Sequence, residues 1–593
     1  MSQTLGNFFR QFRQQRQISV RAAAHGGLTG ASISRFERGQ SDIATSAAIR
    51  LMFNIGMTPA DLSEQITPKG INTPFKILVD HGRKQVGVAL NQYLASCQSN
   101  RMTDLLAKLV RLFSDNATTR PNVSIDLEQR VADFLAYPLT WGALEQVALL
   151  AILPYCSQEL AELLWRRMYV QHQQQLHWSP YTIGFSALIM AATADQPLRL
   201  RLDEDIAKLL NVKATQSRTR SSEPLLIAAR QLCQGADLQA LMNALNTLNA
   251  HKLASFITQT ISQEGQGRAP WHNNALHDNF DPQLALTPSD NFFSGISLGK
   301  LRRQRQLTLA EATGQAWSTS SQSRFESSQS TLAFSSTLQL IQQMGFSFAQ
   351  LSVGNDSISA FHRTYYRLRH MAYDRENTKH SQADYLAVIS QFEADNHDLP
   401  PIMLKMQYLA LYQTVVNFSP DILASTELTP NLTEADQLLI CQYYESLTLP
   451  SLLDIEVLVQ LVGMLNYEAF HRIMHTVVAH TQSDTAAKNE LFNNARFFIV
   501  GALYWQDASL LNELEAYFAR DADYDYNSMV TREVTYVHLA VAAFHHDTPA
   551  LRQQAAKVIA AMRFFIPFPD GAYMPNRWLD FAFDKNYEQL EKA

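Results

Sequence analysis

The chain has 593 residues, of which 46% are hydrophobic and 18% charged. This length exceeds what one hydrophobic core supports, so we expect several domains. The formal net charge of −6 excludes a uniformly basic nucleic-acid binder but allows local basic regions.

Other bulk features indicate an all-α protein. Alanine, leucine and glutamine are abundant, and alternating strand patterns are hard to find. No apolar run approaches the roughly 18 residues of a membrane span, and the first residues lack an apolar signal-peptide core. We therefore expect a cytoplasmic protein with no membrane partner.

Residues 1–66 divide into short predicted helices. Phe8, Phe9 and Phe12 give an apolar face to a first helix that ends near residue 16. Ser19 and Thr29 are placed to cap a second and a third helix, and Gly39 is placed to end the third. Two more helices are expected near 46–55 and up to residue 66.

Two short helices joined by a tight turn, within about 60 residues, are typical of a helix-turn-helix domain. The later helix of such a pair enters the major groove of double-stranded DNA with its N-terminal end. Hydroxyl residues at a helix start bond phosphate through side chain and backbone N–H. The predicted DNA contacts are Thr29, Ala31, Ser32, Arg35 and Arg38, whereas Ile33 and Phe36 are expected to pack inward.

The string RQISVRAAAHGGLTGASISRFERGQSDI (16–43) resembles the helix-turn-helix of the Rgg-type regulators, within the lambda-repressor-like class. Its most specific part is SRFERG (34–39). The resemblance implies an ion pair between Arg13 and Glu37, which we interpret as a structural clamp. It also implies a C-terminal helical domain that binds a short hydrophobic signalling peptide and mediates dimerisation.

Residues 72–262 are expected to form such a helical domain. The window 139–155 is too apolar for exposed helices and weakly matches 452–465, with Glu145 near Glu456. We interpret both as stacked hairpins of the tetratricopeptide (TPR-like) kind. Gly, Pro, Asn and Asp then predict a linker at 263–295, and a polar loop is expected at 213–223.

The segment 12–63 recurs at 301–352 with a constant shift of 289 residues, so that SRFERGQS falls on SRFESSQS. Residues 1–66 carry seven Arg against four acids, about +3, and residues 291–352 also total about +3, which leaves about −12 for the rest. We predict a second, degenerate helix-turn-helix domain at 296–352. Its expected ion pair is Arg302–Glu326, and its expected DNA contacts are Ser318, Ser320, Ser321 and Arg324.

The second copy differs at positions that matter. Ser327-Ser328 replaces Arg38-Gly39, which predicts the loss of a phosphate-facing charge and of the helix stop. Gln322 replaces the inward-facing Ile33, at a cost of about 1 kcal/mol or more if it is unpaired. Two interpretations stay open: this domain contacts DNA, or it is vestigial and retained for packing.

Residues 357–593 are expected to form a second TPR-like domain. Asn493, Asn494 and Arg496 stand on a predicted apolar helix, and asparagine can hold an extended peptide because it both donates and accepts. The alternative is a solvent face or a helix cap. No metal is expected, because His471 and His475 lack a clear third ligand.

No cofactor is expected either. The segment GISLGKL (295–301) is faintly similar to a phosphate-binding loop but lacks the Ser or Thr that follows the Lys in such a loop.

These features predict a DNA-binding transcription regulator that is not an enzyme. We expect it to bind two DNA half-sites as a pseudo-dimer within one chain. A short hydrophobic peptide is the expected effector. The alternative is a helical-repeat protein that sequesters a partner and carries vestigial DNA-binding heads. A homodimer of the double chain also stays open.

Overall fold

The computed structural model describes residues 2–24, 27–66, 74–95, 100–113, 123–135, 143–173, 180–211, 223–263, 293–313, 317–346, 348–351, 359–373, 380–397, 399, 401–418, 432–481, 486–519 and 528–565. Across these ranges the chain is all-α, as predicted, and no helix there is long and apolar enough to cross a membrane. Most of the predicted linker (264–292) and of the polar loop (213–222) lies outside the described residues.

Each basic segment folds into a five-helix unit, called here the first and the second head. The first head contains α1 (Ser2–Gln15), α2 (Val20–Ala23), α3 (Gly30–Glu37), α4 (Thr45–Asn54) and α5 (Pro59–Ile66). The second contains α16 (Gly295–Gln304), α17 (Leu309–Thr313), α18 (Thr319–Glu326), α19 (Phe334–Gln343) and α20 (Phe348–Leu351). The second head therefore begins inside the predicted linker.

The two heads repeat the same backbone geometry at the shift of 289. Gln17 and its counterpart Gln306 both adopt left-handed conformations, with φ of 54° and 55°. A Cβ on Gly6 would lie 2.0 Å from the carbonyl oxygen of Phe36, and one on Gly295 would lie 1.7 Å from that of Phe325. Glycine is thus required where the first helix of each head crosses the third.

The predicted loss of the helix stop in the second head is wrong. Ser328 adopts φ 60°, close to the 68° of Gly39. Its N–H donates to the Phe325 carbonyl at 2.9 Å, as the Gly39 N–H donates to Phe36 at 2.8 Å. A left-handed serine costs roughly 1–2 kcal/mol, so the surrounding fold holds the turn against that preference.

The first helical array follows the first head. Helices two apart in sequence pack together, such as α11 with α13, which is the arrangement of stacked hairpins. Its helices are α6 (Pro74–Ala95), α7 (Arg101–Val110), α8 (Ile125–Phe134), α9 (Ala143–Ile152), α10 (Gln158–Gln173), α11 (Pro180–Thr193), α12 (Gln196–Asn211), α13 (Glu223–Gln234), α14 (Gln239–Thr247) and α15 (His251–Gln263).

The second array follows the same rule, since α21 packs on α23 and α25 on α27. Its helices are α21 (Ala360–Tyr373), α22 (Gln382–Asp395), α23 (Pro401–Phe418), α25 (Glu434–Ser446), α26 (Leu452–Leu461), α27 (Tyr467–His480), α28 (Ala486–Asn493), α29 (Ala495–Tyr504), α30 (Ala508–Ala519), α31 (Ser528–His545) and α32 (Pro549–Phe565). The arrays meet where α14 packs on α32 and Thr535 donates to the Leu248 carbonyl at 3.0 Å.

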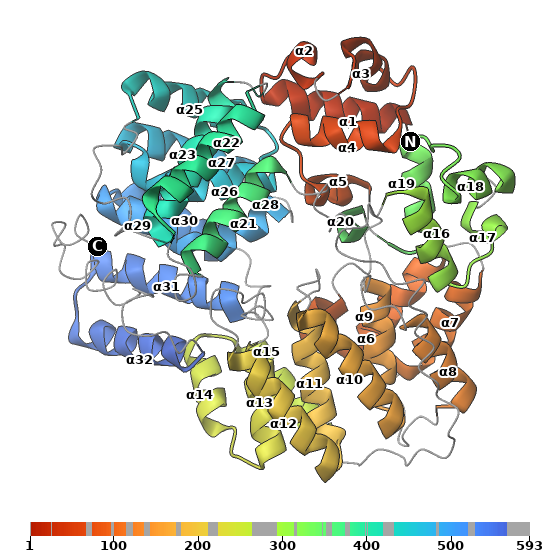
Figure 1. Cartoon of the computed structure of the whole chain (residues 1–593). Helices are drawn as coiled ribbons and strands as arrows, with labels where there is room; N and C mark the ends of the chain where they lie inside the picture. Colours follow the sequence, from red (N-terminus) through yellow and green to blue (C-terminus); the bar gives the residue numbers. More distant parts are fainter. Residues whose placement is uncertain are drawn as a thin grey trace.

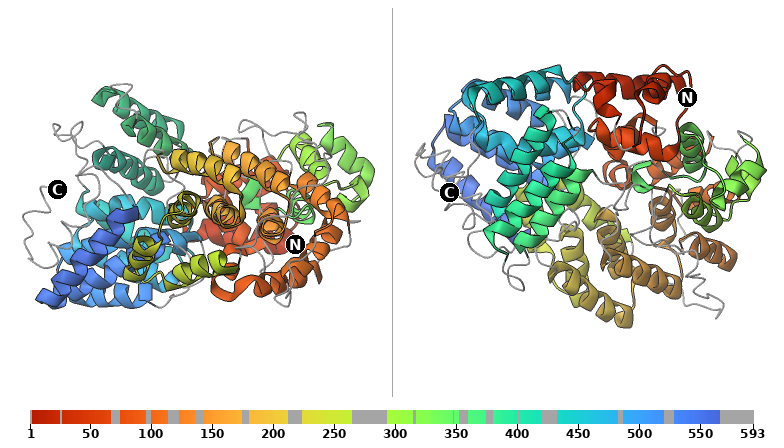
Figure 2. Two further views of the ribbon diagram at one scale, coloured as in Figure 1. Left: turned by 90° about the horizontal axis from the view of Figure 1, so that it is seen from below. Right: turned by 45° about the horizontal axis from the view of Figure 1, so that its top comes forward.

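The heads are exchanged between the halves of the chain. The first head borders the second array, and the second head lies against the first array (Figure 1). The two heads also touch each other through corresponding helices, α4 with α19 and α5 with α20. The views in Figure 2 show the same neighbours from two further directions.

Candidate nucleic-acid interface

In the first head, α3 presents a polar N-terminal end to solvent. Thr29 caps the helix, because its side chain accepts from the Ser32 N–H at 3.2 Å, and the Ser32 hydroxyl donates to the Thr29 carbonyl at 2.8 Å. Of the predicted DNA contacts, Thr29, Ala31, Arg35 and Arg38 are exposed and Ser32 is half-buried. These side chains are therefore grouped on one accessible surface.

The opposite side of α3 is anchored in the core. Ile33 and Phe36 are fully buried, and the Phe36 ring packs edge-on against Phe9 at 5.3 Å between centroids. This packing fixes which side of α3 remains accessible.

Arg13 and Glu37 clamp α1 to α3. Arg13 Nε and its second terminal nitrogen donate to the two Glu37 carboxylate oxygens at 2.6 and 2.8 Å, and its other terminal nitrogen donates to the Ile18 carbonyl at 2.6 Å. Both residues are buried. A buried bidentate pair of this kind sets the helix geometry and is not placed to contact a base.

The second head carries the same clamp. Arg302 donates to both oxygens of Glu326 at 2.7 Å and also to the Leu307 carbonyl. On α18, Ser318 caps the helix by accepting from the Ser321 N–H at 3.1 Å. Among its predicted DNA contacts, Ser318, Ser320 and Arg324 are exposed and Ser321 is half-buried.

Gln322 in the second head is buried but paired. Trp317, which replaces Leu28, donates from its indole N–H to Gln322 Oε1 at 3.0 Å. Gln322 Nε2 donates to Glu326 Oε1 at 2.9 Å. Two substitutions relative to the first head therefore compensate each other, and the cost expected for an unpaired amide does not arise.

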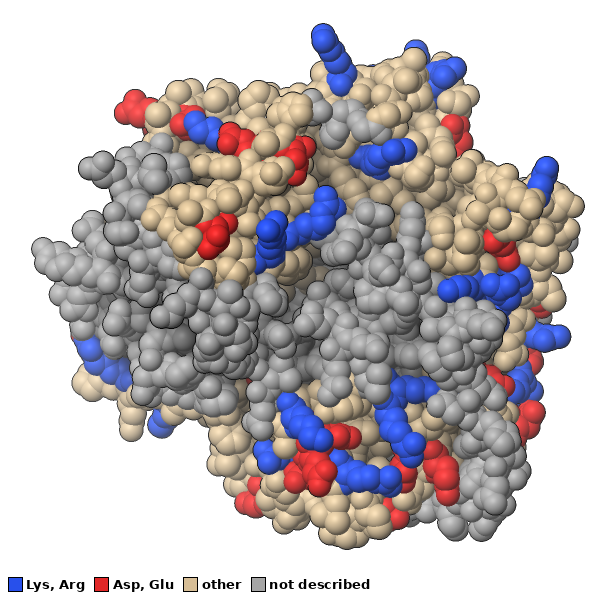
Figure 3. Space-filling view, viewed as in Figure 1, with Lys and Arg blue, Asp and Glu red and all other residues tan. Residues whose placement is uncertain are grey.

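The heads differ in the charge they expose. Of the first-head arginines, Arg13 and Arg16 are buried, as are Arg305 and most of Arg302 in the second head. The exposed arginines of the first head are Arg10, Arg21, Arg35, Arg38 and Arg50, against only Arg303 and Arg324 in the second. Basic side chains stand out from the heads at the top and right of the face in Figure 3.

Equivalent residues meet at the contact between the heads. Ala44 and its counterpart Ala333 form an antiparallel bridge, and the Phe334 N–H donates to the Ile43 carbonyl at 2.8 Å. Next to it, between non-equivalent positions, the hydroxyls of Thr45 and Thr337 lie 2.7 Å apart. The contact of Ala44 with Ala333, which are equivalent positions, is the property of an isologous, two-fold interface.

A buried ion pair joins each head to the array of the other half. Arg16 donates to Asp454 of α26 at 2.5 Å, and Arg305, its counterpart, pairs with Glu145 of α9. The sequence repeat already indicates that the two arginines correspond, because Arg16 and Arg305 occupy the same position in the aligned strings. The counterpart of Glu145 by contact is Asp454, so the proposed match with Glu456 is wrong by two residues.

The three residues proposed for peptide binding already have partners. The apolar helix expected over 490–500 is broken at Asn494, which lies between α28 and α29 and donates to Glu490. Arg496 pairs with Glu533, and Asn493 also bonds Glu490. Burial, aided by the nearby Glu456, raises the pKa of Glu490 to about 7. The group is a half-buried polar cluster.

The histidines four apart on α27 contact each other and two acids. His471 pairs with Asp507 at 2.6 Å and His475 with Glu513 at 2.5 Å. Within the described ranges, no group of three or more His, Cys, Asp or Glu side chains is arranged to hold a metal ion.

Comparison with known proteins finds no matching family model and no matching curated protein. Solved structures do match. Rgg2, an SHP pheromone receptor of Streptococcus dysgalactiae, is 14% identical, covers 50% of this chain and 99% of its own, and has a TM-score of 0.35. The competence regulator ComR of Streptococcus vestibularis is 15% identical, covers 50% of this chain and 98% of its own, and has a TM-score of 0.24. Each of these matches spans half of the chain.

Proposed function

We propose that the chain is a cytoplasmic DNA-binding transcription regulator that acts as an intramolecular pseudo-dimer. The observation that carries this proposal is the isologous contact at Ala44 and Ala333, which joins two helix-turn-helix units whose polar helix ends, on α3 and α18, face solvent. Paired units of this kind bind two half-sites about one helical turn apart. The family resemblance of the SRFERG string (34–39) agrees with this proposal.

Each head has a defined role in the proposal. Thr29, Ala31 and Ser32 lie at the groove-facing end of α3, and Arg35 and Arg38 attract phosphate. In the second head, Ser318, Ser320, Ser321 and Arg324 do the same with less charge. Because the heads differ in sequence and in exposed arginines, we expect an asymmetric pair of half-sites, with most of the affinity from the first.

The deciding experiment is genome-wide binding of the tagged protein, followed by footprinting of the strongest site. We expect a footprint over two unequal half-sites, and affinity that falls steeply with salt as arginines displace counterions. Arg35→Ala with Arg38→Ala should weaken binding strongly, whereas Arg552→Ala, an exposed arginine on α32, should not. A perfect palindrome, a single protected half-site or unchanged binding by the double variant would contradict the proposal.

The alternative, a sequestration protein with vestigial heads, rests on the altered residues of the second head. Both alterations are accommodated: Gln322 is hydrogen-bonded and Ser328 keeps the turn. The observation that still favours the sequestration protein is the smaller number of exposed arginines on the second head. Its signature would be retention of a protein partner with no salt-dependent affinity for any DNA.

We also propose that a short hydrophobic peptide acts on the second array near Asn493, Asn494 and Arg496. Since these residues bond Glu490 and Glu533, a peptide would have to displace those partners, which would shift the population of head arrangements. Spent culture medium serves as the peptide source. We expect it to change DNA binding by the wild type but not by Asn494→Ala, and equal responses of the two proteins would contradict this site.

A further inference from the structure

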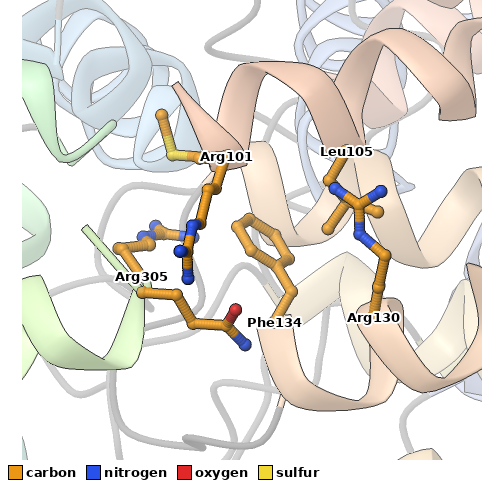
Figure 4. A pocket seen from close by; sticks show the side chains of 7 residues that line it. Arg101, Leu105, Arg130, Phe134 and Arg305 are labelled. Atoms are coloured by element: carbon orange, nitrogen blue, oxygen red, sulfur yellow. The ribbon is translucent and has the colours of Figure 1, made fainter. Parts of the chain in front are cut away.

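A cavity lies at the junction of the second head and the first array. It has a volume of about 270 Å³, and its walls come from α7, α8 and the residues that end α16. Three arginines line it, Arg101, Arg130 and Arg305, together with apolar atoms of Leu105 and Phe134. Arg101 and Arg305 lie on one side of the Phe134 ring and Arg130 on the other (Figure 4).

Arg305 lines this cavity and carries buried hydrogen-bond donors that no described residue accepts. It is 2% exposed, and one terminal nitrogen forms the ion pair with Glu145. Its Nε and its other terminal nitrogen have no hydrogen-bond partner among the described residues. Its guanidinium lies 4.7 Å from the ring centre of Phe134 and 4.2 Å from that of Phe346. Buried donors without acceptors are rare and point to a missing partner.

Arg16, the counterpart of Arg305 in the first head, has a hydrogen-bond acceptor at each of its two terminal nitrogens. One terminal nitrogen of Arg16 donates to the Phe12 carbonyl at 3.0 Å. The other donates to Asp454 at 2.5 Å and lies 3.4 Å from the Leu449 carbonyl. Both arginines leave Nε without a hydrogen-bond partner among the described residues, but only Arg305 also leaves a terminal nitrogen without one.

The charges around the cavity favour an anion. Arg130 donates to Asp104 at 2.9 Å, and Glu311 accepts the backbone N–H of Arg101. Neither acid lines the cavity, and Glu145 does not line it either. Each of the three arginines has an acid nearby, but the described residues that line the cavity include three guanidinium groups and no carboxylate. The site is partly shielded from water, where charge-assisted bonds are strong.

We propose that this cavity binds a small organic oxyanion, carrying a carboxylate or phosphate group and a short apolar part. The planar guanidinium fork matches either oxyanion. Arg305 would supply the inner donors, Arg101 and Arg130 the flanking charge, and Phe134 and Leu105 would cover the apolar part. Because Arg305 belongs to the head and Arg101 and Arg130 to the array, the ligand would tie the second head to the first array.

The test uses the full chain, with succinate and inorganic phosphate as separate probes at constant ionic strength and chloride as the control salt. Calorimetry should detect saturable binding of at least one probe, and which probe binds assigns the oxyanion. Hydrogen exchange of α16 and α17 amides should slow when that probe binds. Arg101→Gln should weaken binding at least tenfold, whereas Arg111→Gln, an exposed arginine of the same array outside the cavity, should leave it unchanged.

Arg305→Gln should abolish binding, but it also removes the cation that pairs with the buried Glu145, so the exposed Arg101 variant is the deciding one. Absence of saturable binding by both probes would overturn the proposal. Equal weakening by Arg111→Gln would also overturn it, since the effect would then be general charge screening. So would loss of DNA retention in Arg101→Gln without any binding of the probes, because the arginines would then contact DNA phosphate.

Discussion

Replacing Arg16 by methionine should release the first head from the second array. The Arg16 side chain is 0% exposed and that of Asp454 is 5% exposed, so the variant leaves a buried carboxylate without its cation. Removing one partner of a buried pair typically costs about 3–5 kcal/mol. Asp454 keeps donors from Tyr443 at 2.6 Å and from Ser451 at 2.7 and 2.8 Å, which argues for the lower end, about 3 kcal/mol.

A cost of about 3 kcal/mol corresponds to roughly a hundredfold shift in the docking equilibrium, since about 1.4 kcal/mol is tenfold. Native-state hydrogen exchange measures this change in the equilibrium between the docked and the undocked first head. Amides of α1 and α5 should exchange faster in the variant, whereas those of α27, which do not depend on the head, should be unchanged. The matched control is Arg552→Met, because Arg552 pairs with Asp547 at the surface with both side chains nearly half exposed, where such pairs contribute less than about 1 kcal/mol.

Equal, small effects of the two arginine variants on α1 exchange would contradict a buried ion pair that holds the first head. A double change of Arg16 to Met and Asp454 to Leu that cost more than the sum of the single changes would also contradict it, because a true pair shows compensation in a double-mutant cycle.

Three further predictions address the heads. Ser328→Gly should stabilise the second head by about 1 kcal/mol, measured by urea unfolding, because it removes the left-handed serine. Gly295→Ala should destabilise it by about 3 kcal/mol through overpacking against Phe325, whereas Gly463→Ala, with open space around its Cβ, should not. Burial raises the pKa of Asp61 from 3.8 to about 6, so protonation favours the folded state. The contribution of Asp61 to stability should therefore fall by about 2 kcal/mol from pH 4 to pH 7, a loss that should be absent in Asp61→Asn.

The heads were predictable from the sequence because their signals are local. Caps such as Ser19 and Thr29 act within three residues, and apolar spacing alone identifies Ile33 and Phe36 as core. The repeat then transferred these assignments to the second copy. The error at Ser328 has a physical reason: glycine preference describes an isolated turn, but the packed helices on either side hold serine in the same conformation.

The roles of Arg16 and Arg305 were not predictable from local pattern. Both stand in basic strings that look like phosphate contacts, and only tertiary structure separates them from neighbours such as Arg303. Their partners are 438 and 160 residues away in sequence, so no local spacing connects them. The net charge of each segment accordingly overstated the positive charge that its head exposes, because buried, paired arginines count in the sum like exposed ones.

The covalent link between the halves explains how the junctions were able to diverge. In a homodimer of separate chains, each substitution appears in both heads, so the cost of the left-handed Ser328 would be incurred twice. Joining the halves raises the effective concentration of one for the other to the order of millimolar, so one complete junction suffices to hold the arrangement. The Arg16 junction has its terminal nitrogens satisfied, while Arg305 has donors left over. The second head should therefore be released first, with α16 and α18 amides exchanging before those of α1 and α3, and the reverse order would show that the Arg305 junction is the tighter one.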